Sequence, residues 1–210
     1  MNSRPELKLD WCSYAAAKYA VEKWHYSKTM PMPPWNCIGV WESQRFVGAV
    51  VFGRGASPNL GKAYGCTNTQ VCELLRVALT QHRWEVTRMV SIAVSITAKR
   101  NPKLRLVVSF ADTNQGHSGG IYRGGNWLYA GMTPEKKHFK DKRGRIWHDR
   151  QATLTGVTNQ FGNRSRCAKR SECEPVELLG KHRFLMPLDD EMRRRIEPLR
   201  QSYPSAASQA

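Results

Sequence analysis

The chain has 210 residues, 40% of them hydrophobic, which is enough to bury one core. It carries 33 Lys and Arg against 17 Asp and Glu, and the formal charge of +16 favours an anionic partner: nucleic acid, an acidic membrane surface or a phosphorylated substrate.

No stretch is apolar and long enough to cross a bilayer, and the N-terminus has no signal-peptide pattern, so we expect a cytoplasmic protein without a membrane partner. Six cysteines without a CxxC pair argue against a structural zinc site and are typical of reduced thiols.

The basic charge is concentrated in one part of the chain. Residues 136–170 hold eleven Lys or Arg against two acids, Asp141 and Asp149. Aromatic and imidazole side chains are interleaved with these charges, namely Phe139, Trp147, His138 and His148. A solvated surface is the simpler explanation of a charge run, but this mixture is typical of a nucleic-acid surface. The sequence therefore favours a DNA or RNA partner.

The first predicted element is a helix over residues 12–25, capped by Asp10 or Ser13. Apolar residues recur at helical spacing along it, namely Tyr14, Ala17, Val21 and Trp24. Prolines from residue 31 onward prevent its continuation. His25 and Tyr26 at its end either face solvent or face a ligand.

Strands are predicted next. Residues 37–41 and 45–52 favour an antiparallel hairpin, and a long loop follows. Residues 71–79 favour a strand, whose alternation would put Cys72, Leu74, Arg76 and Ala78 on one face. Charged residues in this strand, Glu73 and Arg76, need partners if they are buried.

A βαβ unit follows from the next segments. A helix over residues 87–100, capped by Thr87, leads into a valine-rich run at 104–111 that predicts a buried strand parallel to 71–79. That strand ends at Asp112, which could cap a short helix or take part in chemistry. Another short strand is expected at 127–132.

The C-terminal part has weaker patterns. A basic hairpin is expected at 137–140 and 145–148, and residues 177–185 and 190–200 look like short peripheral segments. The chain is therefore divided into a domain at 1–160, a basic C-terminal extension at 161–200 packed on it, and a disordered tail at 201–210.

The order helix, hairpin, strand, helix, strand, helix, strand is similar to the GNAT fold of acyl-CoA-dependent N-acyltransferases. This resemblance implies an α/β fold with a mixed sheet flanked by helices, and a cleft where two strands part. It also implies an acyl-CoA-type donor whose pyrophosphate binds to backbone amides before the helix at 87–100. The loop QHRWEVTR (81–88) lacks the glycines of that cradle, so the resemblance supports the fold better than the cofactor.

A second resemblance rests on separated motifs: HYS (25–27), FGRGASPNLG (52–61), ELLRVALTQH (73–82), RMVSIAVS (88–95), NPKLRLVVSFAD (101–112) and GHSGGIYRGGNW (116–127). Together they resemble the Mom family of phage DNA-modification proteins over about residues 7–150. This implies modification of adenine in double-stranded DNA, whose exocyclic amine acquires a carbamoylmethyl (glycinamide) group that protects phage DNA from host restriction. It also implies bound iron, a small-molecule donor and action in the host bacterial cytoplasm.

The resemblance to the Mom family implies roles for individual residues. The expected catalytic residues are Asp112, Tyr122, Tyr26 and Arg76. The expected cofactor-binding residues are Arg76, Ser91, Thr87 and Arg88. An Fe(II) site would take His25, Asp112 and Tyr26, with Tyr122 or His117 as further candidates, because histidine plus carboxylate is a common non-heme iron arrangement. Asp112 could instead act as a general base on the adenine amine.

Access to the target amine requires base flipping or duplex distortion. The aromatic rings of Trp127, Tyr122 and Trp35 are stacking candidates or core residues. The expected DNA-binding residues are Lys136, Lys137, Lys140, Lys142, Arg143, Arg145 and Trp127. Two alternatives are an acetyl-CoA-dependent N-acetyltransferase of a small amine or protein, and a non-enzymatic basic DNA-binding protein. The oligomeric state stays open, a dimer included.

Overall fold

The computed structural model describes residues 4–31, 34–55, 57, 59–160 and 163–203, which form two compact units. The first unit is Met1–Ala111, Ser118–Gly131 and His182–Ala210, and the second is Asp112–His117 and Met132–Lys181. The ends of these units do not coincide with the boundary expected at residue 160. Most of the tail expected at 201–210 lies outside the described residues. No helix in the described ranges is long and apolar enough to cross a membrane.

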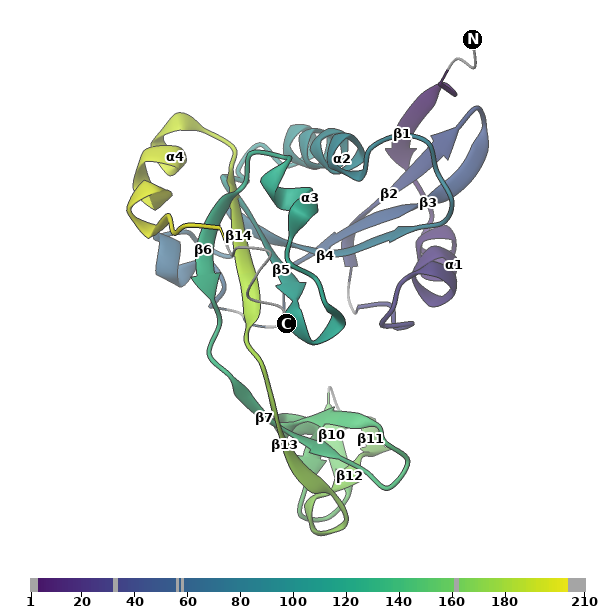
Figure 1. Ribbon diagram of the computed structural model, residues 1–210, viewed down its shortest axis with the longest axis vertical. Coiled ribbons are helices and arrows are strands. Elements are labelled where there is room, and N and C mark those ends of the chain that lie inside the picture. Colours follow the sequence, from purple (N-terminus) through teal and green to yellow (C-terminus); the bar gives the residue numbers. More distant parts are fainter. Residues whose placement is uncertain (1–3, 32–33, 56, 58, 161–162, 204–210) are drawn as a thin grey trace. The chain divides into compact units, whose positions relative to one another are not determined.

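The first unit is built on a seven-stranded mixed sheet with the order β1-β2-β3-β4-β5-β14-β6 (Figure 1). Its strands are β1 Leu7–Trp11, β2 Pro34–Glu42, β3 Arg45–Gly53, β4 Val71–Leu79, β5 Leu106–Asp112, β14 Lys181–Pro187 and β6 Leu128–Met132. Strands β1 to β4 are antiparallel neighbours, and β4 pairs with β5 in parallel. The predicted α/β class, hairpin and βαβ unit are confirmed.

Helices cover both faces of this sheet. The helices are α1 Tyr14–Trp24, α2 Val86–Arg100, α3 Gly120–Arg123 and α4 Asp190–Ile196, with 3-10 turns η1 Lys62–Tyr64 and η5 Glu197–Leu199. Met89 and Ala93 of α2 pack in one hydrophobic cluster with Val50 of β3, whereas Ala17 of α1 packs in another with the next residue, Val51. Because neighbouring strand residues point to opposite faces, α1 and α2 lie on opposite sides of the sheet.

Two helix starts were predicted, and one is confirmed. Ser13 caps α1, since its hydroxyl accepts a hydrogen bond from the backbone N–H of Ala16 at 3.1 Å. Thr87 does not cap α2, because the cap position is Glu85 and Thr87 lies in the first turn. The Thr87 hydroxyl donates instead to the carbonyl of Ile121 at 3.3 Å and joins α2 to α3.

Residues 177–185 were wrongly predicted to be peripheral. Strand β14 lies inside the sheet between β5 and β6, and its Phe184 and Leu185 are fully buried. Strand β1 was not predicted at all. Both strands mix apolar with charged residues, so composition alone did not distinguish them from surface segments.

A β-bulge changes which face of the sheet the side chains of β4 lie on. Val51 of β3 pairs with Arg76, but the next residue, Phe52, pairs with Leu74, so one residue of β4 is inserted. As a result Leu74 packs in the α2 cluster and Ala78 in the α1 cluster. The predicted shared face of Leu74, Arg76 and Ala78 is therefore wrong, because strict alternation holds only in an unbulged strand.

The second unit consists of short strands. They are β7 Lys136–Lys140, β8 Ile146–His148, β9 Ala152–Thr153, β10 Val157–Gln160, β11 Asn163–Arg166, β12 Ala168–Lys169 and β13 Glu174–Leu178, with 3-10 turns η2 Thr113–Gln115, η3 Asp149–Gln151 and η4 Arg170–Glu172. They form the sheets β13-β7-β8, β10-β11 and β12-β9. The antiparallel β7–β8 pair confirms the predicted basic hairpin.

Candidate active site and nucleic-acid interface

The parallel strands β4 and β5 stop pairing before either strand ends. Their register runs from Val71↔Leu106 to Leu74↔Ser109, while the strands continue to Leu79 and Asp112. At the last pair the Ser109 hydroxyl donates to the carbonyl of Leu74 at 3.0 Å. A side chain thus satisfies a backbone acceptor where the ladder ends.

Tyr122 of α3 is hydrogen-bonded to Ser109, where the pairing of β4 and β5 ends. Its hydroxyl lies 2.7 Å from Ser109 Oγ, and because the only Ser109 proton goes to Leu74, Tyr122 must be the donor. Its ring stacks on Phe184 at 4.7 Å and meets Trp127 edge-on at 5.0 Å. Burial raises the pKa of Tyr122 to about 12, with the Tyr26 phenol and Glu73 carboxylate adding to the rise. Tyr122 is therefore a protonated, buried donor at neutral pH.

Arg76 follows the bulge of β4. Its Nη1 donates to the carbonyl of Leu75 at 2.7 Å. Its Nε is buried and has no hydrogen-bond partner within the described residues. A buried guanidinium nitrogen without a partner costs free energy, so this atom is suited to a ligand oxygen.

His25 and Tyr26 lie at the end of α1 with their rings 4.2 Å apart. His25 is buried, whereas 46% of the Tyr26 surface is exposed. The backbone N–H of Ser27 donates to His25 Nδ1 at 3.1 Å, and Ser27 Oγ lies 2.8 Å from the same atom. Because Nδ1 is an acceptor here, the ring is neutral and carries its proton on Nε2.

Asp112 ends β5 and caps the 3-10 turn η2, as one of the two sequence interpretations proposed. Its Oδ1 accepts from the backbone N–H and the side-chain amide of Asn114, both at 3.1 Å. Lys181 Nζ lies 2.8 Å from Oδ2, and only 15% of the Asp112 side chain is exposed. Burial acts to raise the pKa of Asp112, but the hydrogen bond and charge of Lys181 outweigh it, and the pKa lies below its usual value. Asp112 is a carboxylate at neutral pH.

The structure brings part of the predicted catalytic set together. Tyr26 and Tyr122 lie close enough for the Tyr26 phenol to raise the pKa of Tyr122, and Glu73 acts on Tyr122 in the same way. Asp112 and His117 belong to the second unit. The expectation that His25 faces Asp112 stays a prediction.

The donor set does not fit the iron expected at His25, Asp112 and Tyr26. No group of three or more His, Cys, Asp or Glu within the described part of the chain could hold a metal ion. Nδ1 of His25 already accepts the Ser27 N–H. Ligation through Nε2 would require the proton on Nδ1, which that hydrogen bond opposes.

The loop before α2 does not fit an acyl-CoA pyrophosphate. The backbone N–H groups of Arg83 and Trp84 both donate to Oε1 of Glu42, at 2.7 and 2.9 Å. Glu42 is only 3% exposed, so its carboxylate takes the place that a phosphate would need. Glu85 at the helix cap adds a second carboxylate, ion-paired with Arg4 at 2.8 Å. The two loop amides that could bind a phosphate are thus already bonded to Glu42, which is also paired with Arg45 at 3.6 Å.

The remaining residues expected to bind the cofactor have other contacts. The guanidinium of Arg88 stacks over the Trp84 ring at 4.9 Å, and Thr87 is hydrogen-bonded to α3. Ser91 lies on the exposed side of α2. Together with Arg76 these residues stay a predicted set, and none of them forms a phosphate cradle with the loop amides.

The expected DNA contacts are exposed where they are described. Exposed residues are Lys137, Lys140, Lys142, Arg143 and Arg145, and the side chain of Lys136 lies outside the described part of the structure. The guanidinium of Arg145 stacks on Trp147 at 4.0 Å. Asp141 organises the turn between β7 and β8 by accepting from the backbone of Arg143 and Arg145 and from the Trp147 indole.

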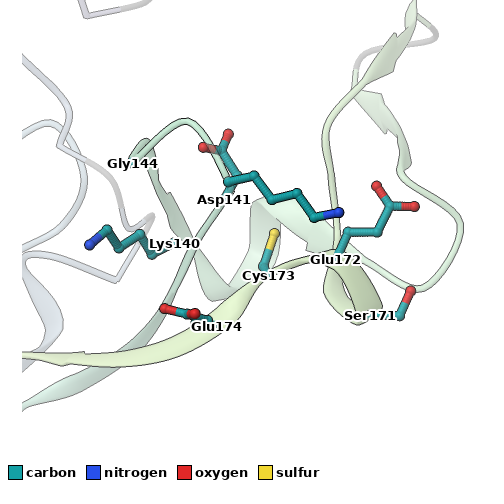
Figure 2. A pocket seen from close by; sticks show the side chains of 8 residues that line it. Lys140, Asp141, Gly144, Ser171, Glu172, Cys173 and Glu174 are labelled. Carbon is teal, nitrogen blue, oxygen red and sulfur yellow. The ribbon is translucent and has the colours of Figure 1, made fainter.

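Two of these basic residues lie beside acidic side chains. Lys140 and Lys142 line a hollow of about 620 Å³ together with the acids Asp141, Glu172 and Glu174 (Figure 2). This mixed charge makes the hollow a weak phosphate site. Trp127 is 1% exposed and packs in the core, so we correct its predicted role from DNA contact to core packing.

Sequence reasoning missed three residues that shape these sites. Ser109 interrupts the apolar run of β5, and a lone hydroxyl in a buried strand was the available signal. Glu42 falls in the predicted hairpin turn, and nothing local indicated burial. Lys181 lies in the segment wrongly predicted to be peripheral.

Fold and site together define an α/β protein with a GNAT-like order of elements, whose two parallel strands part beside a buried hydroxyl pair. The family model described as the Mom protein family matches residues 6–205, and the chain belongs to this family. It is 25% identical over 195 residues to the protein named methylcarbamoylase mom of Escherichia phage Mu, covering 91% of this chain and 79% of that protein.

Solved structures with a similar fold include acetyltransferases. An N-acetyltransferase from Staphylococcus aureus Mu50 is 10% identical with a TM-score of 0.48, over 88% of this chain and 99% of that one. A Bacillus subtilis acetyltransferase in complex with CoA is 12% identical with a TM-score of 0.45, over 88% of this chain and 100% of that one. At these sequence identities and TM-scores the similarity concerns the fold alone.

Proposed function

We propose that this protein is a phage DNA-modification enzyme that places a carbamoylmethyl (glycinamide) group on the exocyclic amine of adenine in double-stranded DNA. The modified DNA would resist host restriction enzymes, and the reaction would take place in the bacterial cytoplasm. The observation that carries this proposal is the family match over residues 6–205, together with the name methylcarbamoylase of the phage Mu relative. The basic, acid-poor segment at 136–170 supports DNA as the partner.

The proposed step is a substitution at carbon. The adenine N6 attacks the methylene carbon of a carbamoylmethyl donor, and an N–C bond forms. The bond from that carbon to the leaving group breaks, its electron pair stays with the leaving group, and the amine loses one proton. The reaction is redox-neutral, so it requires a donor with a leaving group and a proton acceptor.

Asp112 is the proposed acceptor for the amine. A carboxylate can accept a hydrogen bond from the adenine N–H and then take the proton. Lys181 keeps Asp112 ionised at neutral pH, which makes it a ready acceptor and a weak base. We therefore propose that Asp112 orients the amine and receives the proton as the N–C bond forms. Arg76, whose Nε has no hydrogen-bond partner in the described part of the chain, would hold an oxygen of the donor.

Tyr26 and Tyr122 have different proposed roles. Tyr26 is half-exposed on the ring of His25 and can contact the substrate. Tyr122 is buried and acts through Ser109 as a positioning residue. Iron is left out of the proposed step because the hydrogen bonds of His25 do not suit ligation.

The alternative of an acetyl-CoA-dependent acetyltransferase is disfavoured by Glu42, whose carboxylate occupies the loop amides. The experiment expresses the chain in bacteria, digests host DNA to nucleosides and analyses them by mass spectrometry. We expect deoxyadenosine carrying a carbamoylmethyl group from wild type. An unmodified pool beside well-folded protein would overturn the proposal, and it is the result expected of an acetyltransferase that acts on a small amine or protein.

Asp112→Asn is the matched catalytic variant. Asparagine also caps helices well, so the turn at η2 should persist while the carboxylate is lost. Asp190→Asn on the exposed first turn of α4 is the control for loss of one carboxylate. We expect the first variant to lose the modified nucleoside and the second to retain it. Equal yields from both would remove Asp112 from the reaction.

A further inference from the structure

The ribbon β10–β11 in the second unit has no apolar face. The two strands form a separate antiparallel sheet with the register Val157↔Arg166 to Gln160↔Asn163 (Figure 1). Val157 is the one apolar residue in their sequences, VTNQ and NRSR. An isolated two-stranded ribbon is only marginally stable in water and normally relies on a packed hydrophobic face. Packing therefore does not explain the composition of this ribbon.

The register decides which side chains share a face. Opposed residues lie on the same face, and successive residues alternate between faces. Arg164 is opposite Asn159, and Arg166 is opposite Val157, so the two pairs are two positions apart in each strand. Asn159, Arg164 and Arg166 consequently share one face, and all three are exposed.

The net charge of the ribbon and its sequence neighbours is positive. Residues 150–171 contain no Asp or Glu. The same stretch has five basic residues, which are Arg150, Arg164, Arg166, Lys169 and Arg170. Two of them are ion-paired with acids outside it, Lys169 with Glu172 at 3.6 Å and Arg170 with Asp149 at 2.6 Å. Such a segment complements the phosphates of nucleic acid and avoids repulsion by them.

Hydrogen bonds fix the base of the ribbon. The Thr153 hydroxyl accepts from the backbone N–H of Val157 and donates to its carbonyl, both at 3.1 Å. The backbone N–H of Cys167 donates to the carbonyl of Gly156 at 2.9 Å and closes the other strand end. The ribbon is thus a positioned element and not a loose loop.

We propose that β10–β11 enters the major groove of duplex DNA and reads the bases around the target adenine. This inference rests on the proposed function. The major groove admits a two-stranded antiparallel ribbon, and the exocyclic amine of adenine lies at its edge. Arginine pairs with guanine and asparagine with adenine in that groove, so the shared face of Asn159, Arg164 and Arg166 has the residue types that discriminate bases.

The first experiment measures binding of the full chain to labelled duplex DNA by fluorescence anisotropy over a series of salt concentrations. Arg164→Ala/Arg166→Ala should weaken binding by about tenfold or more and lower the salt dependence. Arg193→Ala/Arg194→Ala on the exposed side of α4 is the charge-matched control and should weaken it less. Thermal unfolding shows that each variant is folded.

The second experiment maps the sequence context of modified adenines in host DNA. Arg164→Lys/Arg166→Lys keeps the charge but loses the bidentate fork, so binding should persist while the context changes. Asn159→Ala should broaden the context and leave the salt dependence unchanged.

The outcomes separate two failures. Wild-type modification with unchanged affinity and context in all ribbon variants overturns the ribbon inference and leaves the proposed function intact. A wild type that modifies no adenine overturns both. A wild type that prefers single-stranded RNA to duplex DNA overturns the major-groove inference.

Discussion

Replacing Glu42 tests the account of the loop before α2. Its carboxylate is 3% exposed and accepts two backbone hydrogen bonds, at 2.7 and 2.9 Å. Glu42→Ala removes both hydrogen bonds from the N–H groups of Arg83 and Trp84, and a hydrogen bond to a charged group contributes about 1.5–3 kcal/mol. We therefore expect the free energy of unfolding to fall by about 4 kcal/mol.

Glu42→Gln separates charge from hydrogen bonding. The amide oxygen can still accept from both donors, but neutral hydrogen bonds are about half as strong as charge-assisted ones. The expected loss is about 2 kcal/mol, between wild type and the alanine variant.

The measurement is urea unfolding followed by circular dichroism, with the midpoint compared at constant slope. Glu22→Ala is the control, because Glu22 is half-exposed on α1 and its pair with Lys18 is separated by 3.7 Å. Such surface pairs contribute about 0–1 kcal/mol. If Glu42→Ala unfolded within about 1 kcal/mol of Glu22→Ala, the two hydrogen bonds would not hold this loop.

Three further outcomes are expected. Coenzyme A and acetyl-CoA should leave the melting temperature of the wild type unchanged; a stabilisation of about 2.7 kcal/mol, as given by a ligand at a hundred times its Kd, would refute the argument from Glu42. Lys181→Met should lower stability at neutral pH. Because the folded pKa of Asp112 lies below the ordinary value of 3.8, its contribution is present above that pH and lost as the pH falls through the folded pKa. The difference from wild type should therefore shrink in acid, and a constant difference down to pH 2 would contradict the pairing. Tyr122→Phe should cost about 1 kcal/mol and remove the tyrosine that ionises near pH 12 in a spectrophotometric titration; an unchanged titration would mean that another tyrosine has that pKa.

Regular amphipathic segments were predictable from the sequence, because their pattern reflects the same burial that stabilises them. The bounds of β4 were predicted without error, and α2 and β5 were each placed within two residues at either end. Ser13 was identified as a cap because a hydroxyl before an apolar helix face has a local function.

Long-range pairing was not predictable in the same way. The insertion of β14 between β5 and β6 depends on partners about fifty residues or more away in the chain. The bulge opposite Val51 depends on a match between two strands, and neither strand alone carries its signal. Long-range contacts of this kind were missed most often at the candidate site. Glu42 acts on Arg83 and Trp84, about forty residues later, so a single-sequence pattern has no reason to connect them.

The place of β14 in the sheet has a consequence for synthesis on the ribosome. When β6 has emerged, β5 and β6 still lack the strand that separates them, and the second unit must be made before that strand appears. The backbone edges of both strands therefore remain open while about fifty further residues are added, which exposes them to wrong pairing. A chain that stops before Phe184 would carry every residue proposed here for catalysis and yet lack most of the strand that joins β5 to β6 in the sheet.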